Sequence, residues 1–415
     1  MKLLTVDAGA PLPDLPPPVV GEQWVLVCLH REPLGILRFA ARGCSGGELA
    51  RMIGGRFGDR IQRHMAGDRL ATGRPFDPEQ LAGACPRRTA VDLPRATVAV
   101  CTRNGAGRIT ECLDALLELE YPSDRLELMV VDNAPSDDAT HRLVESRYPS
   151  IRYVLEPKPG LDRARNRAIV EATGDVLAFT DDDVSVDAGW IDAIGRLFAA
   201  EPDVDVVTGL IVADEIDVES QRLFEIYGGF GRGFDRRDFR VDTVSGERAA
   251  CRHGAAGRFG AGANMAFRRR LFDRIGPFDP ALDVGTPTNG GGDLEMFFRA
   301  LKEGGTLVYE PAAIVRHRHR RTYDALRTQI RNNGIGFYAY LVRSARHYPD
   351  ERVALLRLGT WWFWWWNVRR LAWSFVRPSN LPRDLILAEL AGCLAGLRRY
   401  DASQQLARTV DGAAR

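Results

Sequence analysis

Residues 174–183 read Gly-Asp-Val-Leu-Ala-Phe-Thr-Asp-Asp-Asp, and the interpretation of the whole chain starts from this stretch. The apolar run Val176–Phe179 is long enough for a buried strand and too short for a helix. Three carboxylates follow it, and alternation along an extended chain predicts Asp181 and Asp183 on one side and Asp182 on the other. Converging carboxylates favour a hard divalent cation, whereas a solvated acidic turn is the alternative that these residues leave open.

Length and composition limit the class of protein. A chain of 415 residues has room for two or three domains, and 56 basic against 55 acidic residues exclude a global bias toward nucleic acid. The start of the chain carries no secretory apolar region, and no uncharged apolar stretch reaches the length of a membrane-spanning helix. The scattered cysteines predict reduced thiols, a cytoplasmic location and no zinc site. They are Cys28, Cys44, Cys85, Cys101, Cys112, Cys251 and Cys393.

The first part of the chain predicts a small separate module. Residues 1–18 are proline-rich and are expected to form an extended, poorly packed leader. Residues 19–72 predict an α+β module, and the prolines of residues 73–95 indicate a linker. The expected elements of the module are strands Trp24–Leu29 and Gly35–Phe39 and a helix over Ser45–His64. Its histidines, His30 and His64, are interpreted as isolated surface or structural residues.

Residues 96–322 alternate between predicted strands and helices. The strands are Thr97–Cys101, Leu128–Val131, Ile151–Leu155 and Val176–Phe179, and the helices lie around Ile109–Leu117, Asp138–Arg147 and Leu161–Ala172. This order predicts an α/β fold with a Rossmann-like, mostly parallel central sheet flanked by helices. Ligands of such sheets bind beyond the carboxyl ends of the strands. We therefore expect Thr102–Asn104, Asp132–Asn133 and Asp181–Asp183 to meet at one edge.

Six segments then resemble, in order, the motifs of family 2 glycosyltransferases. They are Val98–Asn104, Val130–Asp138, Gly160–Asn166, Gly174–Asp183, Gly262–Phe267 and Gly290–Glu295. The resemblance covers roughly residues 95–320 and implies the GT-A fold. It also implies transfer of a sugar from a nucleoside-diphosphate sugar to an acceptor hydroxyl with inversion, assisted by Mn²⁺ or Mg²⁺.

The resemblance implies roles for individual residues at the donor side. The implied nucleotide-sugar-binding positions are Thr102, Arg103, Asn104, Asp132, Arg165, Asn166, Asp181 and Asp182. Asp132 would accept a hydrogen bond from the base, although a turn residue capping the following loop is the alternative. Asp181 would contact the ribose and Asp183 the metal, and the triple Asp leaves this register open by one residue.

The acceptor side needs a general base, because a sugar hydroxyl is a poor nucleophile near neutral pH. The resemblance points to Asp293, which can also begin a helix as a simple N-cap. Many family members carry Glu-Asp where this chain has Gly292-Asp293, which leaves Glu295 as a substitute. The other positions implied near the acceptor are Gly262, Asn264 and His319.

A basic segment follows the predicted strand Thr306–Tyr309. Alternation places His317 and His319 on one face, which suits a contact with the metal or the diphosphate. The resemblance favours His317 as the metal ligand. A basic surface cluster without a ligand is the alternative.

Residues 323–415 predict a C-terminal helical region rich in arginine and tryptophan. Residues 316–370 contain twelve arginines and only three acidic residues, and six of the eight tryptophans lie in Trp361–Trp373. This composition is typical of a membrane–water interface. The uncharged run Leu358–Val368 is too short to span a bilayer, so we expect attachment to the inner surface of the membrane and access to a lipid-linked acceptor. Packing within a helical subdomain or a homodimer is the competing interpretation.

Two other functional classes are alternatives to the transferase. A sugar nucleotidyltransferase would need a glycine-rich phosphate loop, of which residues 101–108 are only a faint version. An inactive sugar-nucleotide-binding or scaffold protein would not need all of the carboxylates named above. The motifs do not identify the sugar, the base or the acceptor, which is a sugar, a lipid-linked molecule or another small molecule.

Overall fold

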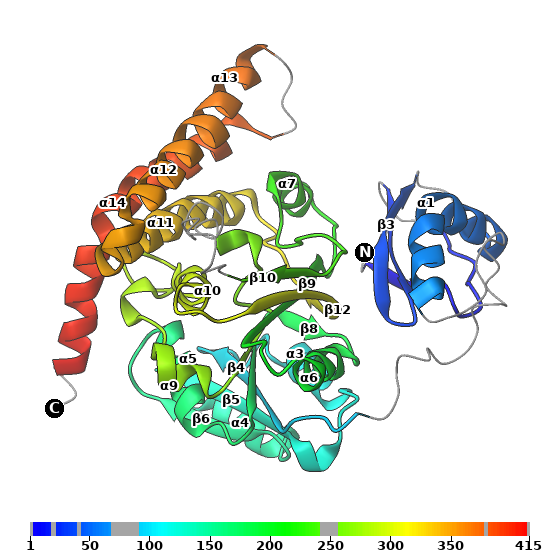
Figure 1. Ribbon diagram of the computed structural model, residues 1–415, viewed down its shortest axis with the longest axis horizontal. Coiled ribbons are helices and arrows are strands. Elements are labelled where there is room, and N and C mark those ends of the chain that lie inside the picture. Colours follow the sequence, from blue (N-terminus) through cyan, green and yellow to red (C-terminus); the bar gives the residue numbers. More distant parts are fainter. Residues whose placement is uncertain are drawn as a thin grey trace.

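The computed structural model describes residues 3–17, 22–39, 43–67, 91–240, 256–376 and 381–412. Within these ranges the central sheet is built from the strands β4 (Ala96–Thr102), β5 (Leu126–Asn133), β6 (Arg152–Glu156), β7 (Val176–Asp181), β8 (Val184–Val186), β9 (Val206–Ala213), β10 (Arg237–Phe239), β11 (Met265–Arg268) and β12 (Leu307–His317). Their order is β10-β12-β9-β11-β7-β4-β5-β6, and β8 pairs with β12. Figure 1 shows helices on both faces of this sheet.

The helices of this region are α3 (Thr110–Leu117), α4 (Ala139–Arg147), α5 (Leu161–Glu171), α6 (Trp190–Ala200), α7 (Glu219–Tyr227), α9 (Leu271–Ile275) and α10 (Gly292–Lys302). Short 3₁₀ turns are η1 (Ser123–Arg125), η2 (Ala256–Arg258) and η3 (Pro280–Leu282). The four strands and three helices expected between residues 97 and 179 are confirmed. The expected strand Thr306–Tyr309 is part of the longer β12, which is irregular between Glu310 and Ile314.

The sheet is mostly parallel, as expected. Strands β4, β5, β6 and β7 run parallel, and so do β9 and β12, whereas β11 runs antiparallel between β7 and β9. Alternate residues of each strand face the two apolar clusters that sandwich the sheet: Ala99 and Phe179 belong to one cluster, Val98 and Ala178 to the other. Burial of both faces explains why these strands are continuous apolar runs.

The pairing of the strands brings the expected polar segments together. Thr102 lies beside Asp132 across β4 and β5, and Cys101 lies beside Asp181 across β4 and β7. All three strands point the same way, so the polar residues that follow them share one edge of the sheet. This prediction is confirmed.

The N-terminal part corrects one expectation. Leu4–Asp7 forms strand β1, which pairs in parallel with β2 (Gln23–Leu29), and β2 pairs with β3 (Glu32–Phe39). Helix α1 (Gly46–Gly67) covers this sheet, and Leu15 is buried with it. The leader is therefore packed rather than loose, because its apolar residues cover the edge and the face that the hairpin alone would leave exposed.

The N-terminal sheet is attached to the central sheet. The backbone N–H of Leu3 donates to the carbonyl of Asp214 at 2.8 Å, and Arg316 donates to the carbonyl of Leu3 at 3.1 Å. The two histidines are not isolated: Nδ1 of His30 lies 2.9 Å from Nε2 of His64, which is buried. Most of the predicted linker, residues 73–90, lies outside the described residues, as do Cys85 and Cys251.

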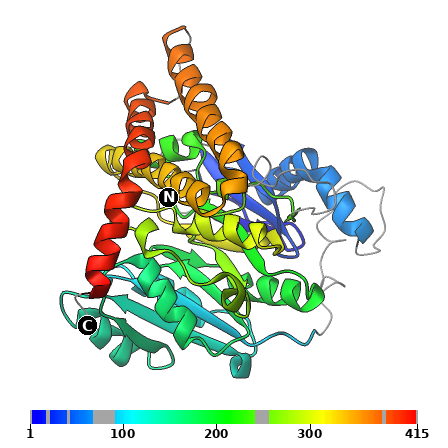
Figure 2. The same cartoon turned by 60° about the vertical axis from the view of Figure 1, so that its left-hand side comes forward.

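The C-terminal region is helical, as expected. It contains α11 (Tyr323–His347), a 3₁₀ turn η4 (Pro349–Glu351), α12 (Arg352–Trp361), a π-helical segment η5 (Trp362–Val368), α13 (Arg369–Val376) and α14 (Arg383–Gly412). Helices α11 and α14 pack closely, because any side chain at Gly392 would lie 2.1 Å from the carbonyl oxygen of Arg331. Helices α12, α13 and the adjoining end of α14 project beyond the body of the molecule (Figures 1 and 2). No helix in the described part of the chain is long and apolar enough to span a bilayer.

Candidate active site

A cavity of about 170 Å³ lies beyond the carboxyl end of β7. Among its lining residues are Asp162, Arg165, Asp181, Gly262, Asp293 and His317. Five of these six were predicted from the sequence, and they come from five separate segments of the chain. Asp162 was not predicted.

Asp181 ends β7, and Asp182 and Asp183 lie in the turn that follows, so simple alternation does not hold beyond Asp181. Oδ2 of Asp182 accepts a hydrogen bond from the Thr102 hydroxyl at 2.5 Å and lies 2.7 Å from Nη2 of Arg108. Oδ1 of Asp183 lies 3.5 Å from Nε2 of His317. Asp182 therefore holds the loop after β4 in place, while Asp183 faces the histidine at the end of β12.

A chain of polar contacts orients His317. Oε1 of Glu225 lies 2.8 Å from Nε2 of His319, and Nδ1 of His319 lies 3.2 Å from Nδ1 of His317. An ionised carboxylate only accepts, so neutral rings would carry protons on Nε2 of His319 and Nδ1 of His317. Nε2 of His317 then carries no proton, and its lone pair faces Asp183. Burial lowers the pKa of His317 to about 4, which favours this neutral form. His319 thus supports its neighbour instead of lining the cavity.

The loop after β4 is closed tightly over Thr102. A Cβ at Gly105 would lie 2.0 Å from Oγ1 of Thr102, so only glycine fits there. Asn104 has a φ of +52°, and its side-chain oxygen accepts hydrogen bonds from the N–H and hydroxyl of Ser136 at 2.9 and 3.1 Å. Asn104 therefore ties together the loops after β4 and β5, while the side chain of Arg103 is exposed.

Asp132 is fully buried at the end of β5. One of its oxygens, Oδ2, accepts from the hydroxyl of Tyr153 at 3.0 Å, and Oδ1 has no hydrogen-bond partner among the described residues. Burial raises the pKa of Asp132. A buried acceptor without a partner is costly, so Oδ1 is a suitable acceptor for a ligand N–H.

Arg165 is the cation of the cavity. It donates to Oδ1 of Asp162 at 2.9 Å and lies 3.9 Å from Oδ1 of Asp181. A Cβ at Gly262 would lie 2.5 Å from the guanidinium, so this glycine makes room for it. Oδ2 of Asp162 is buried and has no hydrogen-bond partner in the described chain.

Asp162 belongs to a buried pair of carboxyl groups. Burial, with the nearby charge of Asp283, raises the pKa of Asp162 well above its usual range. Burial also raises the pKa of Asp283 to about 6. Sequence reasoning missed both residues, because an Asp in the first turn of a helix is usually a cap, and Asp283 lies far away in sequence.

Asp293 lies in the first turn of α10. The backbone N–H of Gly262 donates to its Oδ2 at 2.9 Å, and the N–H of Leu294 donates to its Oδ1 at 2.9 Å. The carboxylate is therefore oriented by the backbone, and the positive end of the helix favours its charge. It faces the same cavity as Arg165 and Asp181.

Two predicted positions are occupied by structural contacts. The side-chain amide of Asn166 exchanges two hydrogen bonds with the backbone of Phe278, at 2.8 and 2.9 Å. Asn264 is fully buried, accepts from the indole N–H of Trp190 at 2.9 Å and donates to the carbonyls of Leu210 and Ala313. Asn264 is therefore a structural residue, which corrects its assignment to the acceptor side, because both of its N–H groups are already donated. Asn166 holds the backbone of Phe278, and neither amide lines the cavity.

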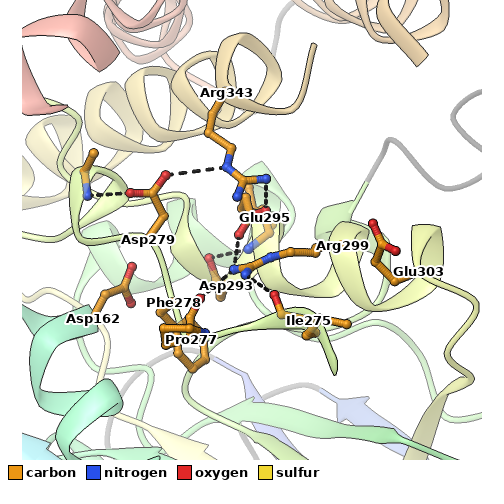
Figure 3. Close-up of polar contacts among 12 residues, drawn as sticks. Asp162, Ile275, Pro277, Phe278, Asp279, Asp293, Glu295, Arg299, Glu303 and Arg343 are labelled. Atoms are coloured by element: carbon orange, nitrogen blue, oxygen red, sulfur yellow. Dashed lines mark hydrogen bonds and ion pairs between the residues drawn. The ribbon is translucent and has the colours of Figure 1, made fainter. Parts of the chain in front are cut away.

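Glu295 is also a structural residue rather than a substitute base. It is fully buried in α10, where its Oε2 accepts from Arg299 at 2.7 Å and its Oε1 pairs with Arg343 of α11. Figure 3 shows the two guanidinium groups around this carboxylate, with Asp279 on the far side of Arg343. The position of Glu295 between two arginines removes it from the cavity.

Replacing Glu295 with glutamine is expected to destabilise the protein. The buried guanidinium of Arg299 would lose its counter-charge and that of Arg343 would keep only Asp279, which costs about 3–5 kcal/mol in the free energy of unfolding. Urea denaturation would measure this loss, with Glu145→Gln as the control because Glu145 is exposed on α4. If Glu295→Gln leaves the free energy of unfolding unchanged but abolishes turnover, the structural role of Glu295 is wrong.

Comparison with known proteins identifies the class. Residues 97–276 match the model of the family described as Glycosyl transferase family 2. Polypeptide N-acetylgalactosaminyltransferase 5 of Caenorhabditis elegans is 27% identical over 249 residues, which are 55% of this chain and 38% of the relative. Glycosyltransferase AglE of Haloferax volcanii is 26% identical over 58% of this chain and 72% of its own length.

Among solved structures, the mannosyltransferase PcManGT of Pyrobaculum calidifontis, in complex with GDP-Man and Mn²⁺, is similar. The TM-score is 0.45 at 22% identity, over 79% of this chain and 90% of that one. The matched region spans 38% of the length of the Caenorhabditis elegans relative and 42% of the length of polypeptide N-acetylgalactosaminyltransferase 11 of Xenopus tropicalis, which is 28% identical over 60% of this chain. The part of the chain from residue 97 to residue 276, which holds most strands of the central α/β sheet, is therefore similar to the glycosyltransferases of family 2.

Proposed function

We propose that the protein is a metal-assisted, inverting glycosyltransferase that moves a sugar from a nucleoside-diphosphate sugar to an acceptor hydroxyl. The observation that carries this proposal is the convergence of Asp293, Arg165 and Asp181 on one cavity, with the Asp183–His317 pair at its edge. Groups that bind a donor and a group that can remove a proton from an acceptor are thus adjacent.

The donor would lie along the carboxyl edge of the sheet. The free oxygen of Asp132 is placed to accept from a base N–H, and the loop of Thr102 and Gly105 borders the same edge. Arg165, which contacts Asp162 and lies 3.9 Å from Asp181, lines the cavity and would pair with the negative diphosphate.

Mn²⁺ or Mg²⁺ would be held by Asp183 and His317. The fit rests on the free Nε2 lone pair that the contacts of His319 leave facing this carboxylate. No cluster of three His, Cys, Asp or Glu side chains suited to a metal occurs among the described residues, so substrate oxygens would supply further ligands. The cation, when bound, stabilises the negative charge of the leaving diphosphate.

Asp293 would act as the general base. As the acceptor oxygen forms its bond to the anomeric carbon, the bond from that carbon to the diphosphate oxygen breaks on the opposite face. The acceptor proton passes to the carboxylate of Asp293, which the N–H groups of Gly262 and Leu294 hold in one orientation. A single displacement of this kind inverts the anomeric centre.

Calorimetry with UDP, GDP and dTDP, each with Mn²⁺ and with EDTA, tests the donor side. We expect metal-dependent binding of one nucleotide, which would also identify the base. If no nucleotide binds under any metal condition, the transferase proposal fails and an inactive scaffold becomes the better interpretation.

A further inference from the structure

An apolar groove of about 520 Å³ lies in the C-terminal helical region. It runs between α11, α12, η5 and α14, and its apolar walls include Leu341, Leu355, Leu356, Phe363, Leu394 and Leu397. The residues that line this groove follow the active-site residues in the chain, and the two cavities share no lining residue.

Large apolar side chains are exposed along the rim of this groove. The exposed fractions are 62% for Leu356, 60% for Trp364 and 57% for Leu394. Further exposed side chains on the same projecting helices are Val353, Trp361, Trp365, Trp373, Phe375, Val376, Leu387 and Leu397. An apolar surface of this extent marks an interaction site.

The charge of this surface is mainly positive, although Arg370 forms an ion pair with Glu389 of α14 at 2.9 Å. The segment from Arg352 to Val376 contains four arginines and no aspartate or glutamate. Arg369 lies over the ring of Trp365, with 4.7 Å between its guanidinium carbon and the ring centroid. Tryptophan and arginine side by side match the head-group layer of a bilayer, where both side chains have apolar and polar ends.

We infer that the projecting helices dock on an anionic lipid surface and that the groove takes a hydrocarbon chain of a lipid. Anionic head groups complement the arginines of residues 352–376. A second copy of the chain would be a poorer partner, because a symmetric contact would bring Arg352, Arg357 and Arg369 of the two copies together, and residues 352–376 contain no acidic residue. The projection of these helices away from the body leaves them free to meet a surface (Figure 2).

The groove is connected to the candidate acceptor side through α11. Gly336 of this helix packs against the loop before α10, since a Cβ at Gly336 would lie 2.9 Å from the carbonyl carbon of Gly290. Tyr338 and Leu341, one turn further along, line the groove. The acceptor of the reaction is therefore a hydroxyl-bearing lipid or lipid-linked sugar, and this part of the inference rests on the proposed function.

Vesicle sedimentation tests the docking without any need for activity. The full chain is expected to bind vesicles of phosphatidylcholine with phosphatidylglycerol more tightly than phosphatidylcholine alone, with binding weakened by salt. Trp364→Glu should weaken binding by about tenfold or more, since it places a like charge in the contact with anionic lipid. Val170→Glu is the control, because Val170 is 77% exposed on α5, a helix that contributes no residue to the groove.

Brominated lipids provide a second measurement, because bromine quenches tryptophan fluorescence only at close range. Quenching by anionic vesicles that is lost in Leu394→Glu would support the docking, and thermal melts would establish that each variant is folded. A wild-type chain that ignores anionic vesicles at low salt, or a dimer that Trp364→Glu dissociates without any vesicle binding, would overturn the inference. Nucleotide calorimetry without lipid reports separately on the proposed function.

Discussion

Replacing Asp293 with asparagine is expected to lower kcat by about 10²–10⁴-fold, the usual contribution of a general base. The amide oxygen can still accept from the N–H of Gly262, so the local fold should persist, but the amide cannot take the acceptor proton. Turnover would be followed as release of nucleoside diphosphate from the donor that calorimetry identifies.

Two controls separate this effect from a structural one. The affinity for the nucleotide should stay the same, because the role proposed for Asp293 is on the acceptor side of the cavity. Asp124→Asn is the matched control, since it changes an exposed carboxylate elsewhere. A kcat within about threefold of the wild-type value would rule out Asp293 as the base, since it falls well below the effect of general-base catalysis.

The second large effect is expected at Asp183. Asp183→Ala removes one of the two protein ligands proposed for the cation, and nucleotide affinity in the presence of Mn²⁺ should fall by about 100-fold or more, because even residues that only support metal ligands cost 10–100-fold. Calorimetry measures this loss, and with EDTA the variant and the wild type should bind equally weakly.

Asp175→Ala is the matched control, because Asp175 precedes the same strand at its opposite end and is exposed. It should keep the metal-dependent affinity. If Asp183→Ala also keeps it, the cation lies elsewhere and the proposed role of the Asp183–His317 pair is wrong.

Local patterns in the sequence were sufficient to predict the strands at the centre of the fold. Strands such as β4 and β7 are apolar runs buried on both faces, and the chain turns polar where each one ends. Parallel packing then requires those ends to share an edge, which is why Thr102, Asp132 and Asp181 could be brought together without a structure. Strands β9 and β11 were not predicted, although the apolar run of β9 carried a comparable signal.

The partners of polar side chains were not predictable in the same way. Asn166 and Asn264 lie in motif segments next to residues of the cavity, yet their amides are used by Phe278 and Trp190. Nothing local to Glu295 indicates that Arg343, 48 positions later, neutralises it. These contacts depend on how distant segments pack.

The sequence by itself determined the α/β class, the polar edge of the sheet and the resemblance to family 2 glycosyltransferases, because these depend on periodicity and on motifs within short stretches. Only the tertiary structure decided that Asp182 binds the first loop while Asp183 faces His317. The tertiary structure also showed that Asp293 lines the cavity, whereas Glu295 is buried between two arginines. The physical reason is that a carboxylate takes its role from the charges and donors around it, and these come from elements far apart in the chain.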